Sequence, residues 1–202
     1  MASKLVVSTF LSLDGIMQGP GGPGEDDSND FPHGGWLPPY VDEGFGRIMG
    51  EQLERADGML LGRRSYDILS SYWPDVPDEE GGAKINGMPK YVTTRTPMTA
   101  DWRNTRVLVG EAAETVAELK KSTDGEILVQ GSSDLLRTLQ RAELIDEYRL
   151  LVFPVILGEG KRLFAEGTAP AGLKLTGSTA TDAGVVYVTY EWAGKPSYGA
   201  VA

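Results

Sequence analysis

Short apolar strands alternate with amphipathic helices along most of this chain, and the alternation limits its fold more than any other feature. Strands are expected at 5–11, 56–61, 90–94, 105–109, 126–129 and 148–157. Helices are expected at 41–55, 64–72 and 111–121, and a further helix begins at 131–134. Because a strand returns parallel to its neighbour only through a crossover, usually a helix, the pattern predicts a mainly parallel α/β sheet with helices over both faces.

The last part of the chain departs from this pattern. Two strands, expected at 173–180 and 184–192, are separated only by the short turn at 181–183. Such a short connection joins antiparallel neighbours, so this hairpin is expected to form an antiparallel edge of the sheet. No internal repeat or linker divides the 202 residues, and one domain, 1–202, is expected.

A segment rich in glycine and proline follows the first strand. Residues 17–39 hold six Gly and five Pro among 23 positions. This is too many breaking residues for a regular helix or strand, so the segment is predicted to be a long loop. A second polar loop is expected at 74–89.

The composition excludes several classes of function. With 19 Lys and Arg against 29 Asp and Glu, the net charge of −10 makes general nucleic-acid binding unfavourable but leaves room for a local basic pocket that binds a phosphorylated small molecule. The absence of Cys excludes disulfides, thiol nucleophiles and Cys-ligated metals, and the single His33 excludes His-rich metal sites. No stretch approaches the ~20 apolar residues of a membrane span. A cytoplasmic protein with no membrane partner is expected.

Polar and cationic residues gather at the ends of three expected strands. They are Gly62, Arg63, Arg64 and Ser65; Thr93, Thr94 and Arg95; and Gln130, Gly131, Ser132 and Ser133. In open α/β sheets, ligands bind beyond the carboxyl ends of the strands, where helix N-termini hold anions. Guanidinium groups pair well with phosphate oxygens. Together the three junctions predict a cradle for a diphosphate ligand that carries an extra phosphate.

Each junction also has a simpler interpretation. Gly62 and Gly131 can be tight turns, Ser132 or Ser133 can be a helix N-cap, and the arginines can be solvated surface charges. Neither G-x-G-x-x-G nor G-x-x-x-x-G-K-[ST] occurs at these junctions. The prediction of a cradle therefore depends on the agreement of all three junctions.

Five motifs in a fixed order resemble those of a known family. They are Ser12-Leu13-Asp14-Gly15, Leu60-Leu61-Gly62-Arg63-Arg64-Ser65-Tyr66, Lys90-Tyr91-Val92-Thr93-Thr94, Ile127-Leu128-Val129-Gln130-Gly131-Ser132, and Pro154-Val155-Ile156-Leu157-Gly158-Glu159-Gly160 before Leu163-Phe164. Over residues 3–192 the chain resembles the dihydrofolate-reductase-like superfamily, most of all the reductase domain of riboflavin biosynthesis. The resemblance implies a three-layer α/β/α fold with a mostly parallel central sheet and an antiparallel C-terminal edge, and a homodimer.

The same resemblance implies NADPH as cofactor. By analogy, residues 62–65 would hold its diphosphate and 2′-phosphate side, 93–95 would flank the adenosine end, and 130–133 would wrap the diphosphate. No metal is implied.

The reacting end of the site has four candidate residues, each with an alternative. Asp14 and Glu159 are predicted catalytic residues, and Asp14, Trp36 and Asp42 are predicted substrate contacts. The alternatives are a plain turn at Asp14, a solvated loop tip at Glu159, core packing of Trp36 and a helix-dipole partner in Asp42. His33 is expected to be a loop residue stacked on Trp36, with general acid as the alternative.

The expected function is therefore an NADPH-dependent reductase of a small heterocyclic metabolite, similar to 5-amino-6-ribosylaminouracil phosphate or to a pterin. Two alternatives stay open. One is a non-catalytic nucleotide-binding or regulatory module that keeps the cradle. The other is an interaction protein that uses its apolar strand 148–157 and its terminal hairpin as an interface.

Overall fold

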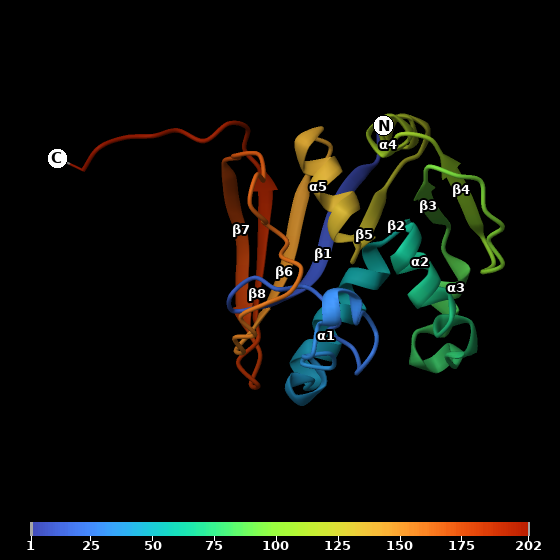
Figure 1. Cartoon of the computed structure of the whole chain (residues 1–202), viewed down its shortest axis with the longest axis horizontal. Helices are drawn as coiled ribbons and strands as arrows, with labels where there is room; N and C mark the ends of the chain where they lie inside the picture. The colour runs from blue at the N-terminus through green and yellow to red at the C-terminus, as the bar shows by residue number, and fades with distance from the viewer. Residues whose placement is uncertain (1, 202) are drawn as a thin grey trace.

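One sheet of eight strands runs through the molecule in the order β4-β3-β2-β5-β1-β6-β8-β7 (Figure 1). The computed structural model describes residues 2–201. The strands are β1 Lys4–Ser12, β2 Gly58–Gly62, β3 Lys90–Thr94, β4 Thr105–Val109, β5 Glu126–Gln130, β6 Glu147–Phe153, β7 Leu173–Ala180 and β8 Val186–Trp192. Neighbours from β4 to β6 are parallel, whereas the β6–β8 and β8–β7 pairs are antiparallel. The predicted mostly parallel sheet with an antiparallel C-terminal edge is confirmed.

Helices cover both faces of this sheet. The helices are α1 Glu43–Arg55, α2 Arg63–Ser70 and α3 Gly82–Gly87 on one face, and α4 Ala112–Ser122 and α5 Ser133–Arg141 on the other. Successive residues of β1 point to opposite faces, so Val6 packs with the α2 and α3 side while Val7 packs with α4 and α5. This is the predicted three-layer α/β/α fold. Within residues 2–201, no helix has both the length and the apolar character needed to cross a membrane.

Strand β6 is shorter than the sequence pattern predicts. The apolar run continues to Leu157, but the strand ends at Phe153 because Pro154 has no N–H to donate to a neighbouring strand. The residues after Pro154 turn back, and Leu13 N–H donates to Val155 O at 2.7 Å. The end of β6 is thereby tied to the end of β1.

The expected loop at 74–89 contains a helix that the sequence pattern does not reveal. Helix α3 is six residues long, too short for a recognisable period. The buried Lys90 side chain supports its end, because Nζ donates to the carbonyls of Ile85 at 3.0 Å and Met88 at 2.9 Å. These short-range bonds from Lys90, which follows the helix closely in the sequence, satisfy carbonyls at and just beyond its C-terminal end.

The glycine- and proline-rich segment 17–39 is irregular, as predicted, except for short 3-10 turns at Ser28–Asp30 and Pro38–Tyr40. It is nevertheless anchored in the core, because Phe31, Trp36 and Leu37 are buried beside Phe153. Burial of such large apolar side chains contributes roughly 1.5–3 kcal/mol each. The segment is therefore an ordered loop with a fixed C-terminal half.

A buried ion network joins three of the central strands. Arg149 of β6 is fully buried and bonds Glu126 of β5 through two nitrogens, at 2.6 and 2.7 Å. Its Nε donates to Glu147 at 2.5 Å, and Lys4 of β1 bonds the same carboxylate. Burial alone would raise the pKa of Glu147, but the hydrogen bonds from Lys4 and Arg149 hold it below its usual value. The Glu147 carboxylate therefore stays ionised inside the protein.

Substitution of Arg149 is predicted to be strongly destabilising. Arg149→Met would leave Glu126 and Glu147 buried without their main partner, so the free energy of unfolding should fall by about 3–5 kcal/mol. Urea denaturation at neutral pH measures this loss. Arg141→Met, at an exposed position at the end of α5, should cost less than about 0.5 kcal/mol. Equal losses in the two variants would contradict a stabilising role of the network.

Candidate functional site

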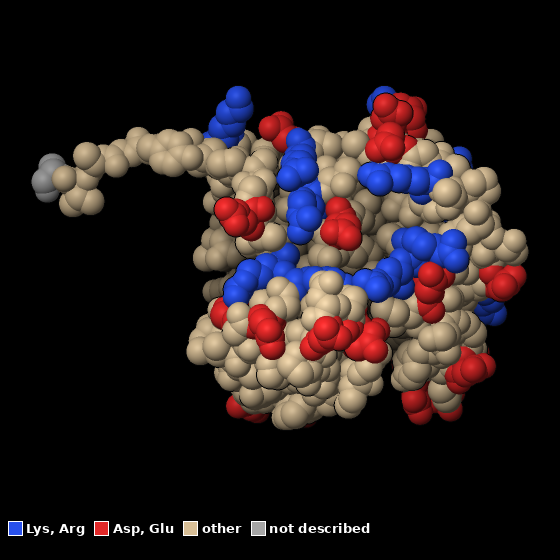
Figure 2. Space-filling model, in the orientation of Figure 1, with Lys and Arg blue, Asp and Glu red and all other residues tan. Residues whose placement is uncertain are grey.

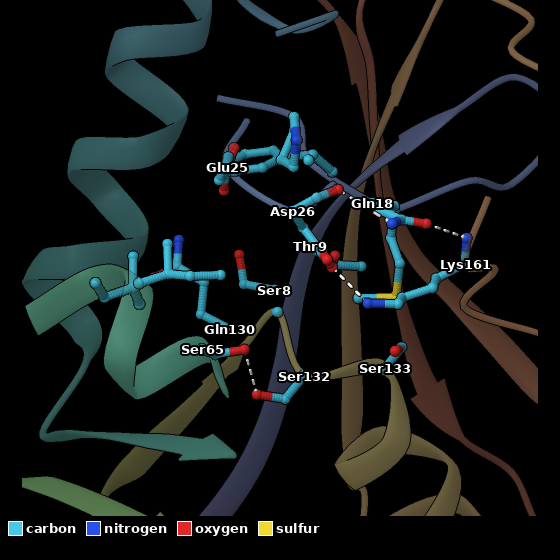
Figure 3. A pocket seen from close by; sticks show the side chains of 17 residues that line it. Ser8, Thr9, Gln18, Glu25, Asp26, Ser65, Gln130, Ser132, Ser133 and Lys161 are labelled. Carbon is cyan, nitrogen blue, oxygen red and sulfur yellow. Dashed lines mark hydrogen bonds and ion pairs between the residues drawn. The ribbon is translucent and has the colours of Figure 1, made fainter. Parts of the chain in front are cut away.

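A cleft lies at the carboxyl ends of β1 and β5 (Figure 3). Its volume is about 140 Å³, and its lining comes from β1, α2, the β5–α5 junction, the loop after β1 and Lys161. The lining residues are Ser8, Thr9, Phe10, Met17, Gln18, Gly19, Pro20, Glu25, Asp26, Ser65, Ile68, Leu69, Gln130, Gly131, Ser132, Ser133 and Lys161. Because β2, β5 and β1 are adjacent and parallel, their carboxyl ends meet at this edge.

The hydroxyl of Ser132 joins two of the predicted junctions. Its Oγ accepts a hydrogen bond from Gly62 N–H at 2.8 Å and donates to Ser65 Oγ at 2.7 Å. Figure 3 shows Ser132 and Ser65 facing each other beside the cleft. Ser132 has a φ of 63°, in the left-handed region, so its side chain turns toward β2 and does not cap its own helix. The β2–α2 and β5–α5 junctions thus form one unit.

Two helix N-termini meet at this unit. Helix α2 follows Gly62 and α5 follows Ser132, and neither N-cap residue supplies a side-chain acceptor to the first turn. The first-turn N–H groups of a helix carry a partial positive charge that favours anions. The side chains of Ser65 and Ser133 from these first turns line the cleft.

Gly131 lets the backbone pass close to α2. Its φ is 65°, and a Cβ atom at this position would lie 3.1 Å from Ser65 Oγ. A larger residue would be strained and would press on the hydroxyl that Ser132 engages. The glycine, the hydroxyls and the two helix starts suit a diphosphate group.

The cationic candidates lie at the rim of the cleft. Arg63 bonds Asp67 of its own helix at 2.9 and 3.0 Å, whereas Arg64 is 64% exposed and lies 3.8 Å from Asp26. Arg95 is exposed and lies 3.8 Å from Glu111. The arginines therefore do not line the cleft itself.

The candidates on β3 lie farther along the sheet. The Thr93 hydroxyl donates to Leu61 O at 3.4 Å, and the Thr94 hydroxyl donates to Thr96 O at 2.8 Å. Neither residue lines the cleft. Thr93 lies opposite Gly62 in the parallel β2–β3 pair. The predicted contact of Thr93 and Thr94 with adenosine stays a prediction.

Asp14 holds together two segments of backbone. Its carboxylate accepts hydrogen bonds from Ser12 Oγ at 2.7 Å, Leu157 N–H at 3.1 Å and Gly158 N–H at 2.9 Å. The bond from Ser12, together with the two backbone bonds, lowers the pKa of Asp14 to about 2. Asp14 does not line the cleft. These contacts describe a positioning role for Asp14, and its predicted catalytic role gains no support from them.

The other predicted residues of the reacting end also lie outside the cleft lining. Trp36 is buried: its Nε1 donates to Gln18 O at 2.8 Å, and its ring meets Phe153 edge-on at 5.4 Å. Asp42 caps α1 by accepting from Phe45 N–H at 2.7 Å, and its second oxygen accepts from Ala183 N–H at 2.8 Å. These contacts match the alternatives given above: core packing for Trp36, and for Asp42 a partner of the α1 dipole, at whose N-terminus it lies.

Glu159 and His33 occupy an exposed corner. The Glu159 carboxylate is 71% exposed and lies 4.0 Å from His33 Nε2. The His33 ring packs edge-on against Phe31 at 5.6 Å, and not on Trp36 as expected. The roles of Glu159 as catalytic acid and of Trp36 and Asp42 as substrate contacts stay predictions. Of the predicted site residues, the structure gathers Ser65 and residues 130–133 in the cleft.

Besides Ser8 and Thr9 of β1, four polar residues of the cleft were not predicted: Gln18, Glu25, Asp26 and Lys161. Three come from the long loop and the fourth from the segment after β6. The sequence offered two signals for them: the acidic run 25–27 within the Gly/Pro loop, and the two cations at 161–162 directly after Gly158-Glu159-Gly160. Their meeting depends on how the loop folds back, which no local pattern encodes.

Comparison with known proteins supplies the family. The RibD C-terminal domain family matches residues 3–187, which is nearly the whole chain. The chain belongs to this family. It is also 29% identical over 196 residues to the uncharacterized protein YyaP of Bacillus subtilis (strain 168), covering 95% of this chain and 96% of that protein.

Solved structures show the same fold. A putative riboflavin biosynthesis protein from Shewanella sp. PV-4 has a TM-score of 0.67 at 23% identity, covering 95% of this chain and 99% of that one. Dihydrofolate reductase from Enterococcus faecalis, solved with NADP(H), has a TM-score of 0.59 at 15% identity, covering 96% and 99%. The expected likeness to the dihydrofolate-reductase-like superfamily is confirmed, and this member of the RibD C-terminal domain family shares its fold.

The role of Asp14 predicts a dependence of stability on pH. Because its pKa is about 2 instead of the ordinary 3.8, ionised Asp14 stabilises the fold above pH 3.8, and this contribution disappears as the pH falls through about 2. Asp14→Asn should therefore lower the free energy of unfolding by about 2 kcal/mol at neutral pH. Denaturation of both proteins from neutral to acid pH should show the difference shrinking. Asp182→Asn, in the exposed β7–β8 turn, is the control. If the difference in free energy of unfolding between Asp14→Asn and the native protein stayed constant with pH, the prediction would be wrong.

Proposed function

We propose that this chain is an NADPH-dependent reductase that delivers a hydride to a small heterocyclic metabolite. The observation that carries the proposal is the pair of uncapped helix N-termini, of α2 and α5, which Ser132 links beside the cleft. Such an arrangement suits the diphosphate of a dinucleotide. Membership of the RibD C-terminal domain family and a fold shared with an NADP(H)-bound dihydrofolate reductase support the choice of cofactor.

Particular residues would hold each part of the cofactor. The diphosphate would lie at Gly131, Ser133 and Ser65, where backbone N–H groups and hydroxyls face the cleft. Arg64 suits the 2′-phosphate better than Arg63 does, because Asp67 already bonds the Arg63 guanidinium twice.

When bound, NADPH supplies the hydride from its nicotinamide ring. The chain's own contribution is to orient the reacting groups and exclude water. Phe10, Met17, Ile68 and Leu69 form the apolar part of the cleft lining. These side chains would keep water from the planar rings, whereas the polar groups of the β5–α5 junction fix the position of the cofactor.

One observation favours a second candidate, a nucleotide-binding module without catalysis. The acids and the lysine that line the cleft are all engaged in holding the loop. Glu25 accepts from Gly22 N–H at 3.2 Å, and Asp26 bonds Lys161 at 2.5 Å. A binding module needs no proton donor, so these contacts suit it, whereas a reductase needs a group that can give a proton to its substrate. Turnover of a substrate separates the two candidates.

Calorimetric titration with NADPH, and with NADH beside it, tests the proposal. We expect micromolar binding of NADPH and much weaker binding of NADH, since arginines near the cleft favour the extra phosphate.

Gly131→Val should abolish binding while the domain stays folded. Gly184→Val is the control, because Gly184 also has a positive φ, of 82°, but lies in the β7–β8 turn. Unchanged affinity in Gly131→Val would remove the β5–α5 junction from the proposed site.

Cofactor oxidation in the presence of pterins and ribosylaminopyrimidines then tests for catalysis. Turnover with either class would support the reductase and exclude the non-catalytic module. Binding of NADPH without turnover of any compound of either class would favour the module.

We also propose that the protein pairs with a second copy of itself through its outer strands. Leu173 and Leu175 of β7 and Val186 of β8 are exposed by 36%, 52% and 41%, although they are apolar. Exposed apolar side chains on an edge strand favour association. Figure 1 shows β7 and β8 at the side of the sheet away from α2 and α3.

Sedimentation velocity tests this pairing. The native chain is expected to be a dimer at micromolar concentration, and Leu175→Asp is expected to be a monomer, because a charge at the centre of the contact would be buried. Lys174→Asp, at the neighbouring position on the opposite face of β7, should remain a dimer. A monomeric native chain would refute the pairing without bearing on the cofactor.

A further inference from the structure

A cationic pocket adjoins the cleft. It has a volume of about 530 Å³, and Ser133 and Lys161 line both spaces. Four cations line the pocket together with two acids and several small or polar residues: Arg64, Arg137, Lys161 and Arg162; Asp134 and Glu166; Ser28, Asn29, Ser133, Gly160 and Ala165. Figure 2 shows Lys and Arg side chains in a row across the middle of this face. In a chain of net charge −10, this local excess of cations needs an explanation.

The carboxylate of Asp26 sits between two of these cations. Its Oδ2 bonds Lys161 Nζ at 2.5 Å, and its Oδ1 lies 3.8 Å from Arg64 and accepts from Ser28 Oγ at 2.6 Å. Burial alone would raise the pKa of Asp26, but the bonds from Lys161 and Ser28 hold it below its usual value, so it stays charged. Asp26 belongs to the loop after β1, whereas Arg64 opens α2 and Lys161 follows β6.

We propose that Lys161 and Arg64 form a binding site for a phosphate group, which Asp26 occupies as an internal stand-in while no ligand is bound. The site serves the ligand of the proposed function, and in that respect it rests on that function. Its chemistry follows from the contacts of Asp26 alone: two cations from separate elements hold an oxyanion at the junction of the cleft and the cationic pocket.

A phosphate would fit this site better than the carboxylate does. A phosphate monoester carries up to two negative charges and three strong acceptor oxygens, against one charge and two oxygens for Asp26. It can therefore meet Lys161, Arg64 and the first turn of α5 at once. Ser133, in that first turn, lines both the cleft and the cationic pocket. A bound phosphate would displace Asp26, and not lie beside it, because two anions repel each other.

Displacement of Asp26 would also make room in the cleft. Ligand pockets typically measure about 300–1,000 Å³, more than the 140 Å³ of this cleft. Residues 17–20 and the acids Glu25 and Asp26 provide the loop side of its lining. Gln18 ties the same loop by donating to Asp26 O at 3.1 Å and accepting from Lys161 N–H at 3.0 Å. Release of the Asp26 carboxylate removes the charged contact that keeps the loop against Lys161.

The first experiment measures the loop without any ligand. Hydrogen–deuterium exchange over residues 19–30 should be faster in Asp26→Asn than in the native chain, because the ion pairs with Lys161 and Arg64 are lost. Asp27→Asn is the matched control, with the same change of charge at the exposed neighbour. It should leave exchange unchanged. Equal exchange in the two variants would overturn the role of Asp26 in holding the loop, whatever the protein binds.

The second experiment measures binding by calorimetry, with inorganic pyrophosphate, NADPH and ribose 5-phosphate as probes. Asp26→Asn should bind at least one probe about fivefold more tightly than the native chain, since no internal anion has to be displaced. Asp27→Asn should change affinity by less than about twofold. This small change is the effect of removing one distant negative charge that repels the probe. Lys161→Met should not bind the probe. Lys121→Met, at an exposed position of α4, should bind it as the native chain does.

The three probes distinguish a cofactor phosphate from a substrate phosphate. They also separate failure of this proposal from failure of the proposed function. A gain for NADPH assigns the site to the cofactor, and a gain only for ribose 5-phosphate assigns it to a phosphorylated substrate. If Asp26→Asn binds pyrophosphate more tightly but the protein does not bind NADPH, the phosphate site is supported and NADPH is refuted as the cofactor. If Asp26→Asn binds every probe no better than Asp27→Asn, or if Lys161→Met binds as the native chain does, the site is overturned.

Discussion

The contact of Arg149 with Glu126 and Glu147 fixes how the central strands lie against each other. The guanidinium reaches from β6 to β5 across β1, which runs between them. A shift of one residue in any of these strands would turn its charged group to the opposite face of the sheet. Because the cleft is formed by the carboxyl ends of the same strands, a network at their amino ends sets its geometry from a distance.

Several acids of this chain serve as acceptors for backbone N–H groups. Asp14 bonds two N–H groups after β6, Asp42 bonds the first turn of α1, Asp57 accepts from Glu126 N–H, and Asp146 accepts from Leu5 N–H. Charge-assisted bonds of this kind are stronger than bonds between neutral groups. The excess of negative charge thus has a structural use, and the few cations near the cleft stand out against it.

The fold could be predicted largely from local patterns, whereas the site could be predicted only in part. Apolar runs and helical spacing identify nearly every strand and helix. Helix α3 was missed because it is only six residues long, and the buried Lys90 that follows it supports its end. Glycines and hydroxyls at strand ends identify the β5–α5 junction. The roles of the acids were harder to predict. Asp14 and Asp42 bond backbone N–H groups, but an Asp that binds substrate would look the same in the sequence. Asp26 and Lys161 could not be paired, because 134 residues separate them and only the fold of the loop brings them together.

The central place of β1 has a consequence for how the protein is made. β1 leaves the ribosome before the other seven strands of the sheet, yet both of its neighbours, β5 and β6, lie within residues 126–153. Until β5 has been synthesised, the apolar residues of β1 have no strand to pair with, and contacts between such distant segments form slowly. The nascent chain therefore carries an unpaired, β-forming segment while more than a hundred further residues are synthesised, so the speed of synthesis and the protection of β1 matter for the yield of folded protein.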